Sequence, residues 1–165
     1  MRKIVIIISL LLSLFAFNIL SAQEVVTQDV DTLHQKAQAF IKKHFFEEKI
    51  ASLRITKERP KVYYEVTLTS GMKIKFSKNG TWEVIVCNNS TIPNGIIPAR
   101  IFKYINQEEL YKNSSIISIS KREEWRGKKL RTYEVEMSRS IGSIFNKRGK
   151  CIAFILYDYY NYPEE

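Results

Sequence analysis

Residues 64–80 read YEVTLTSGMKIKFSKNG, and residues 133–149 read YEVEMSRSIGSIFNKRG. The two stretches align without a gap, and six of their 17 positions are identical, where roughly one identity is expected by chance. Further upstream, Phe40-Ile41 corresponds to Tyr104-Ile105. The chain therefore contains an internal repeat.

The spacing between the copies changes along the chain. The upstream match is 64 residues apart and the downstream match 69, so the second copy carries five extra residues between Lys121 and Tyr133. The stretch 122–129, with the sequence REEWRGKK, reads as a longer, basic hairpin loop. We call it the inserted hairpin.

Each copy is predicted to begin with a helix. In the first copy, Leu33, Ala37 and Ile41 recur at helical spacing, and Thr32 with Gln35 forms a capping box, which predicts a helix over residues 32–46. In the second copy, a helix opens at Ile97-Pro98, since proline is tolerated in a first turn.

After each helix, the apolar residues alternate with polar ones, which is typical of strands with one buried face. Glycines close the tight turns at Ser70-Gly71, Asn79-Gly80 and Arg148-Gly149. A helix followed by about four antiparallel strands, twice over, predicts an α+β fold of two tandem repeats. The helices would lie on one face of the sheet and leave the other face open.

The end of the chain is apolar and aromatic. Residues 151–156, CIAFIL, are apolar at every position, so this strand is expected to be central or covered on both faces. The tail 157–165 contains four tyrosines and is either a strand that finishes the sheet or an exposed recognition edge.

The beginning of the chain reads as an export signal. Arg2 and Lys3 precede a short apolar run, and Leu20-Ser21-Ala22 offers a cleavage site, so residues 1–22 are predicted to be a signal peptide. The alternative is an uncleaved membrane anchor. Cleavage would place the mature chain in the periplasm or outside the cell, with residues 23–30 as a short leader.

Composition limits the partners. The formal charge is +9, and it falls to +7 without Arg2 and Lys3. In an exported protein we expect no nucleic acid partner; the charge suits an anionic glycan, a lipid headgroup or an acidic protein, or it is scattered and only aids solubility. Cys87 and Cys151 either form a disulfide, which export permits, or remain two buried thiols.

We find no pattern that predicts catalysis, a metal site or a cofactor. His34 and His44 are ten positions apart, too far along one helix to share a metal. The carboxylate pairs, such as Glu47-Glu48, are adjacent in sequence and diverge. No phosphate loop, dinucleotide fingerprint or zinc-finger spacing occurs. The sequence favours a protein that is not an enzyme.

An exported chain with these two copies resembles the PepSY-like family of periplasmic proteins of Bacteroidetes-type bacteria. The resemblance lies in Tyr64-Glu65-Val66, in Asn79-Gly80-Thr81-Trp82 and in the helix-opening Ile97-Pro98. It implies a fold similar to that of the β-lactamase inhibitor protein, with repeats over residues 31–87 and 96–156. It does not imply that this chain inhibits an enzyme.

The predicted function is a non-enzymatic binding module for a protein partner, which would bind through the open sheet face and the inserted hairpin, because aromatic and arginine side chains dominate protein interfaces. The alternative is an anionic glycan or lipid headgroup held by the basic loop 126–131. The candidate partner-binding residues are Tyr63, Trp125, Arg126, Lys128, Lys129 and Arg131.

Overall fold

The computed structural model describes residues 23–27, 29–58, 61–87, 91–125 and 129–157. The predicted signal peptide and most of the aromatic tail therefore lie outside the described residues. In the part that is described, no helix is long and apolar enough to cross a membrane.

The fold is one antiparallel sheet of nine strands. Each strand pairs with the next one along the chain, so the order across the sheet follows the order in the sequence. The strands are β1 (Gln23–Thr27), β2 (Ile50–Glu58), β3 (Lys61–Leu68), β4 (Lys73–Ser77), β5 (Trp82–Val86), β6 (Ile116–Trp125), β7 (Lys129–Met137), β8 (Ile141–Asn146) and β9 (Cys151–Leu156).

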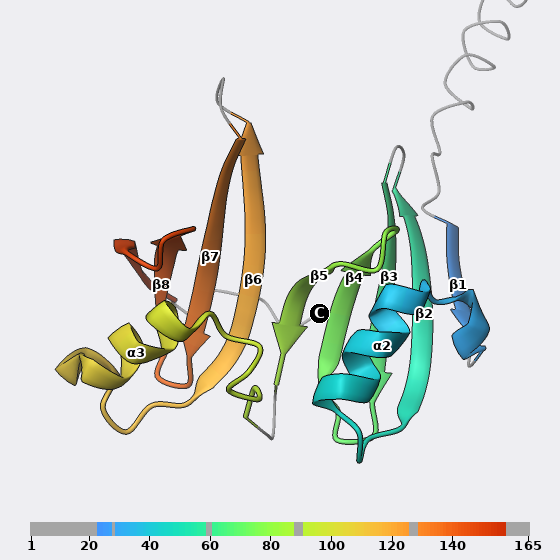
Figure 1. Cartoon of the computed structure of the whole chain (residues 1–165), viewed down its shortest axis with the longest axis horizontal. Helices are drawn as coiled ribbons and strands as arrows, with labels where there is room; N and C mark the ends of the chain where they lie inside the picture. The colour runs from blue at the N-terminus through green and yellow to red at the C-terminus, as the bar shows by residue number, and fades with distance from the viewer. Residues whose placement is uncertain (1–22, 28, 59–60, 88–90, 126–128, 158–165) are drawn as a thin grey trace, which may run out of the picture.

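Both α-helices lie on the same face of this sheet (Figure 1). Helix α2 (Gln35–His44) separates β1 from β2, and α3 (Ala99–Gln107) separates β5 from β6. The short 3₁₀ helices η2 (Val30–Thr32) and η3 (Glu109–Tyr111) flank them. The prediction of an antiparallel sheet with its helices on one face is confirmed.

The core lies between the helices and the sheet. One row of paired, fully buried apolar side chains runs across six strands: Leu53, Val66, Ile74, Ile85, Ile119 and Val135. Helix α2 packs Ala37 and Ile41 against it, and α3 packs Ile101 and Ile105. Because strand side chains alternate between faces, this row fixes which residues point away from the helices.

The first helix starts later than predicted. Thr32 ends η2, and Leu33 has an extended backbone and is buried. The N-cap of α2 is His34, whose Nδ1 accepts a hydrogen bond from the Lys36 amide at 3.1 Å. The capping box at Thr32 is therefore wrong, because burial of Leu33 holds the chain extended where the box required a helix.

Both ends of the described chain lie at the edges of the sheet. Residues 23–27, for which we predicted only a leader, form the edge strand β1 against β2. Residues 151–156 form the opposite edge strand, β9, and not the central or doubly covered strand that was predicted. Ile152, Phe154 and Leu156 are exposed. In a meander the last strand can pair only with its predecessor, whatever its composition.

Tyr157, the first residue of the aromatic tail, is held against the sheet by two hydrogen bonds. The Tyr157 amide donates to the Ser140 carbonyl, and the Tyr157 hydroxyl donates to a Glu134 carboxylate oxygen at 2.7 Å. Cys87 is buried and Cys151 half-buried, and no disulfide joins them.

Candidate functional site

Two long hairpins extend past the middle of the sheet at one end. The pairing of β6 with β7 continues to Trp125 and Lys129, whereas the pairing of β5 with β6 stops at Ser120. On the other side, β3 pairs with β4 only from Tyr63 onwards, although its pairing with β2 begins at Lys61. The turn between β4 and β5 therefore lies in a recess between the two hairpins (Figure 1).

This geometry corrects the prediction of a loop over residues 122–129. Residues 122–125 belong to β6, and Lys129 begins β7. Opposite charges face each other across the pair, as at Glu123 and Arg131, and such cross-strand pairs favour a ladder over a loop.

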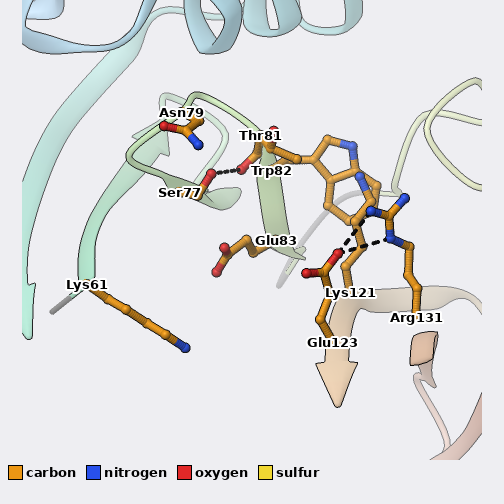
Figure 2. Close-up of a pocket in the computed structure, with 9 residues that line it drawn as sticks. All are labelled: Lys61, Ser77, Asn79, Thr81, Trp82, Glu83, Lys121, Glu123 and Arg131. Carbon is orange, nitrogen blue, oxygen red and sulfur yellow. Dashed lines mark hydrogen bonds and ion pairs between the residues drawn. The ribbon is translucent and has the colours of Figure 1, made fainter. Parts of the chain in front are cut away.

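The recess contains a hollow of about 500 Å³, which we call the notch. Figure 2 shows β6 and β7 residues on one side of the notch and residues of the β4–β5 turn on the other. Its lining residues are Lys61, Ser77, Asn79, Thr81, Trp82, Glu83, Lys121, Glu123 and Arg131.

Lys121 is the central cation of the notch. Its Nζ lies 3.3 Å from the centroid of the Trp82 ring, a cation–π contact. Burial lowers the pKa of Lys121 to about 8, and the positive charges of Arg131 and Lys36 add to this effect, while Glu83 opposes it. The ammonium is therefore held against an aromatic wall in a place that disfavours its charge.

The neighbouring groups are fixed by local contacts. Nε and Nη2 of Arg131 donate to Glu123 Oε1 at 3.2 and 2.9 Å, and Lys36 donates to the Thr81 hydroxyl at 3.1 Å. Ser77 donates its hydroxyl to the Thr81 carbonyl at 3.2 Å. Three cationic and two carboxylate side chains line the notch, which leaves an excess of one positive charge.

The second candidate surface is the sheet face opposite the helices, which we call the outer face. No described helix covers it. The register places one row of residues across its middle: Arg54, Glu65, Lys75, Val84, Ser120 and Glu134.

The outer face carries charges of both signs. On the β4 side, Lys73 and Lys75 point outward by alternation with Ile74, and Lys75 Nζ lies 3.9 Å from the centroid of the Tyr63 ring. On the β7 side are Glu134 and Glu136. Burial and the neighbouring Glu134 charge raise the pKa of Glu136. Glu134 itself pairs with Arg122 at 2.6 Å.

The structure does not bring the predicted site residues together. Tyr63 lies on the outer face, whereas Arg131 lines the notch on the helix side of β7, paired across the strand with Glu123. Arg126 and Lys128 lie outside the described residues, and for Trp125 and Lys129 only the backbone is described, at the ends of β6 and β7.

Lys121 and Trp82 were not predicted as site residues. Lys121 follows the inward alternation of β6, where it reads as an unexplained charge on an apolar face. Trp82 reads as a core residue, and the register shift between β4 and β5 places it opposite the buried Phe76. The available signal was a lysine two positions after Ile119, on the same face of one strand. It was not enough to predict the contact, because the two residues belong to different strands that meet only in the folded sheet.

Comparison with known proteins identifies the family. A family model described as "Putative beta-lactamase-inhibitor-like, PepSY-like" matches residues 62–153, more than half of the 165-residue chain. The chain belongs to this PepSY-like family. The resemblance stated from the sequence is confirmed.

Solved structures from two Bacteroides species are similar over most of the chain. A periplasmic protein of unknown function from Bacteroides vulgatus is 28% identical, with a TM-score of 0.71, and the match covers 80% of this chain and 98% of that one. A second B. vulgatus protein, of the DUF2874 family, is 28% identical with a TM-score of 0.70 and coverages of 81% and 98%.

The third such structure comes from Bacteroides thetaiotaomicron and is named a "putative calcium-regulated periplasmic protein". It is 30% identical, with a TM-score of 0.70, and the match covers 79% of this chain and 95% of that one. A comparison with curated protein sequences gives no match. These relatives are periplasmic proteins, and the predicted periplasmic location of this chain is confirmed with them.

Proposed function

We propose that this periplasmic PepSY-like protein is a non-enzymatic binding module that engages a protein partner through the outer face and the end of the sheet that carries the inserted hairpin. The observation that carries the proposal is the uncovered outer face, with lysines on β4 and carboxylates on β7. Charged groups of both signs on this face orient a protein partner and speed its association.

The chemistry of the outer face supports a macromolecular partner. Tyr63 supplies an aromatic ring backed by Lys75, and Val84 and Val86 lie between the two charged regions. Burial, with the neighbouring Glu134 charge, raises the pKa of Glu136. A basic group of the partner would stabilise its charged form.

An enzymatic role has less support. In the described residues, no group of three or more histidine, cysteine, aspartate or glutamate side chains is placed to hold a metal ion. The relative named calcium-regulated is therefore no basis for a calcium site in this proposal. The relatives' fold, together with the inhibitor-like name of the family, fits a binding role.

We also propose that the sheet arose from two tandem copies with a fold like that of the β-lactamase inhibitor protein. Tyr64 pairs with Phe76 as Tyr133 pairs with Phe145. Phe40 of α2 meets Phe76 edge-on at 5.8 Å, and Tyr104 of α3 meets Phe145 in the same way at 5.4 Å. Superposition of residues 31–87 on residues 96–156 tests this; failure of these aromatic pairs to coincide would contradict it.

A pull-down from native periplasm with the chain from Gln23 onward tests the binding role. We expect a retained protein whose binding weakens by about 2 kcal/mol or more with Tyr63→Ala or Trp125→Ala, since aromatic anchors dominate interface energies. Phe46→Ala, which removes another exposed aromatic ring away from this surface, is the matched control and should retain the partner. Equal retention by all three variants would remove Tyr63 and Trp125 from the site.

The dependence of binding on salt concentration distinguishes a protein partner from the alternative ligand. An anionic glycan or lipid headgroup on loop 126–131 would be released steeply as the ionic strength rises, and Lys128→Glu with Lys129→Glu would abolish its binding. A protein partner would lose association rate and keep most of its affinity.

A further inference from the structure

We propose that the notch receives the carboxylate of a single aspartate or glutamate side chain on a loop of the protein partner, with Lys121 as its ion-pair partner. The inference rests on the proposed function and assigns a chemistry to one part of the partner. It concerns a site at the end of the sheet, apart from the charged row across the middle of the outer face.

Lys121 is a positioned cation without an ion-pair partner in the described part of the chain. The Trp82 ring holds Nζ at 3.3 Å from its centroid. Of the carboxylates in the described part of the chain, none lies within ion-pair distance of this nitrogen. Burial lowers the pKa of Lys121, and the positive charges of Arg131 and Lys36 add to this effect, while the more distant charge of Glu83 opposes it.

The number of charges in the notch favours a single carboxylate. Lys61, Lys121 and Arg131 exceed Glu83 and Glu123 by one positive charge. A polymer that carries repeated sulfate or phosphate groups would bring several negative charges close to these two carboxylates. One carboxylate instead neutralises the excess and leaves the Glu123 to Arg131 pair intact.

The notch has the size and the hydrogen-bonding groups to take a side chain. A hollow of about 500 Å³ admits a side chain with its backbone, and it is far larger than a bare ion requires. The Asn79 amide and the Thr81 hydroxyl line the wall opposite Lys121 (Figure 2). A carboxylate has two acceptor oxygens, so it can take a hydrogen bond from this wall while one oxygen pairs with the ammonium.

Access to the notch is between two strand pairs. The strand pairs β2–β3 and β6–β7 flank the notch, and between them β4 ends at Ser77 and β5 begins at Trp82. A loop can therefore enter from the end of the sheet. The rigid ladder of β6 and β7 holds Lys121 in place before the partner arrives.

NMR titration of the chain from Gln23 onward tests the site, with acetyl-Gly-Glu-Gly-amide as the probe and its glutamine analogue as the matched ligand. The glutamate peptide should shift the Trp82 indole signal saturably and raise the pKa of Lys121 from about 8 towards its ordinary 10.5. The glutamine peptide should bind at least about tenfold more weakly, because it carries no charge. Equal shifts with both peptides would overturn the proposal.

Variants assign the effect to Lys121. Lys121→Met should abolish the glutamate-specific shift, and Lys121→Arg should keep it, since both preserve a long side chain over Trp82 and only the second keeps the charge. Lys103→Met removes an exposed lysine from α3 and should bind like the wild type. Loss in Lys103→Met equal to that in Lys121→Met would overturn the assignment.

Two further probes separate the sources of negative charge. Methyl glucuronide presents the same carboxylate on a sugar, and inorganic phosphate presents a higher charge. Tighter binding of either one than of the glutamate peptide would overturn the assignment to an acidic side chain, whereas weaker binding of both supports it.

Failure of this inference is distinguishable from failure of the proposed function. A partner that Lys121→Met retains as well as the wild type would overturn the inference and leave the protein-binding role standing. A glutamate-specific titration without any captured protein would instead overturn the binding role and keep the carboxylate site.

Discussion

Lys121 lies on the inward face of β6. Two residues earlier on the same face, Ile119 is fully buried. At Lys121 the Trp82 ring lies against the ammonium. A cation is tolerated there because the long aliphatic stem packs while the ammonium reaches the notch.

The lowered pKa of Lys121 predicts a pH dependence of stability. Between about pH 8 and pH 10.5, the folded state has released the Lys121 proton while the unfolded state still holds it. The free energy of unfolding of the wild type should therefore rise with pH in this window relative to that of Lys121→Arg, whose guanidinium stays protonated. Urea titrations at about pH 7.5, 9 and 10.5 measure the difference in the free energy of unfolding between the two proteins. A constant difference would contradict the prediction.

Phe76 and Phe145 are fully buried, whereas Phe46 is 77% exposed. Phe76→Ala and Phe145→Ala should each lower the free energy of unfolding by about 3 to 5 kcal/mol, because each change leaves a cavity in the core. Phe46→Ala is the matched control and should change it little. Chemical denaturation measures all three, and an unchanged midpoint for Phe76→Ala would place this ring outside the core.

At the scale of elements, the turns hold the helices against the sheet. Gly80 and Gly149 both have positive φ and both approach the start of a helix. A Cβ on Gly80 would come within 2.9 Å of the Ala37 amide nitrogen, and a Cβ on Gly149 within 2.6 Å of the Arg100 Cβ. These turns need glycine for their conformation and for space.

Gly71 is the matched control for the close approach of Gly80 and Gly149 to the helices. It also has positive φ, but nothing lies within 4 Å of the position that its Cβ would occupy. Gly71→Ala should cost about 1 to 2 kcal/mol for the backbone conformation alone. Gly80→Ala and Gly149→Ala should cost more, since a helix must also shift. Equal losses in thermal or urea unfolding would show that the close approach does not matter.

At the scale of the whole molecule, one meander presents three distinct surfaces. The helices occupy one face, the outer face carries charges of both signs, and the notch lies at one end between the β2–β3 and β6–β7 strand pairs. The family relatives share the fold over about four-fifths of this chain. The proposed partner would contact the sheet without displacing the core.

The start of the mature chain is predicted from the sequence. We expect the mature chain to begin near Gln23, because the apolar run that precedes it is too short to span a membrane comfortably. N-terminal sequencing of material recovered from the periplasm measures this. Intact Met1 in the membrane fraction would instead mean that the domain is tethered.

The sequence by itself determined the family, the helix-bearing face and the antiparallel strands. Periods of 3.6 and 2 specify which side of an element is buried, and Gly80 and Gly149 mark turns, so these features are encoded within a few neighbouring residues. The two-copy origin remains a prediction from the same pattern. The helix start at Gln35 was misread because burial of Leu33 overrode a local capping signal.

Only the tertiary structure decided the edge position of β9, the pairing of residues 23–27 and the notch. Each depends on how far strands from distant parts of the chain extend beside one another. Trp82 and Lys121 come into contact because β5 begins at Trp82, whereas β6 extends past its last paired position, Ser120. The register of β7 on β6 brings Arg131 to the same place. Local patterns give the face of a side chain, but the relative lengths and register of paired strands determine which side chains meet.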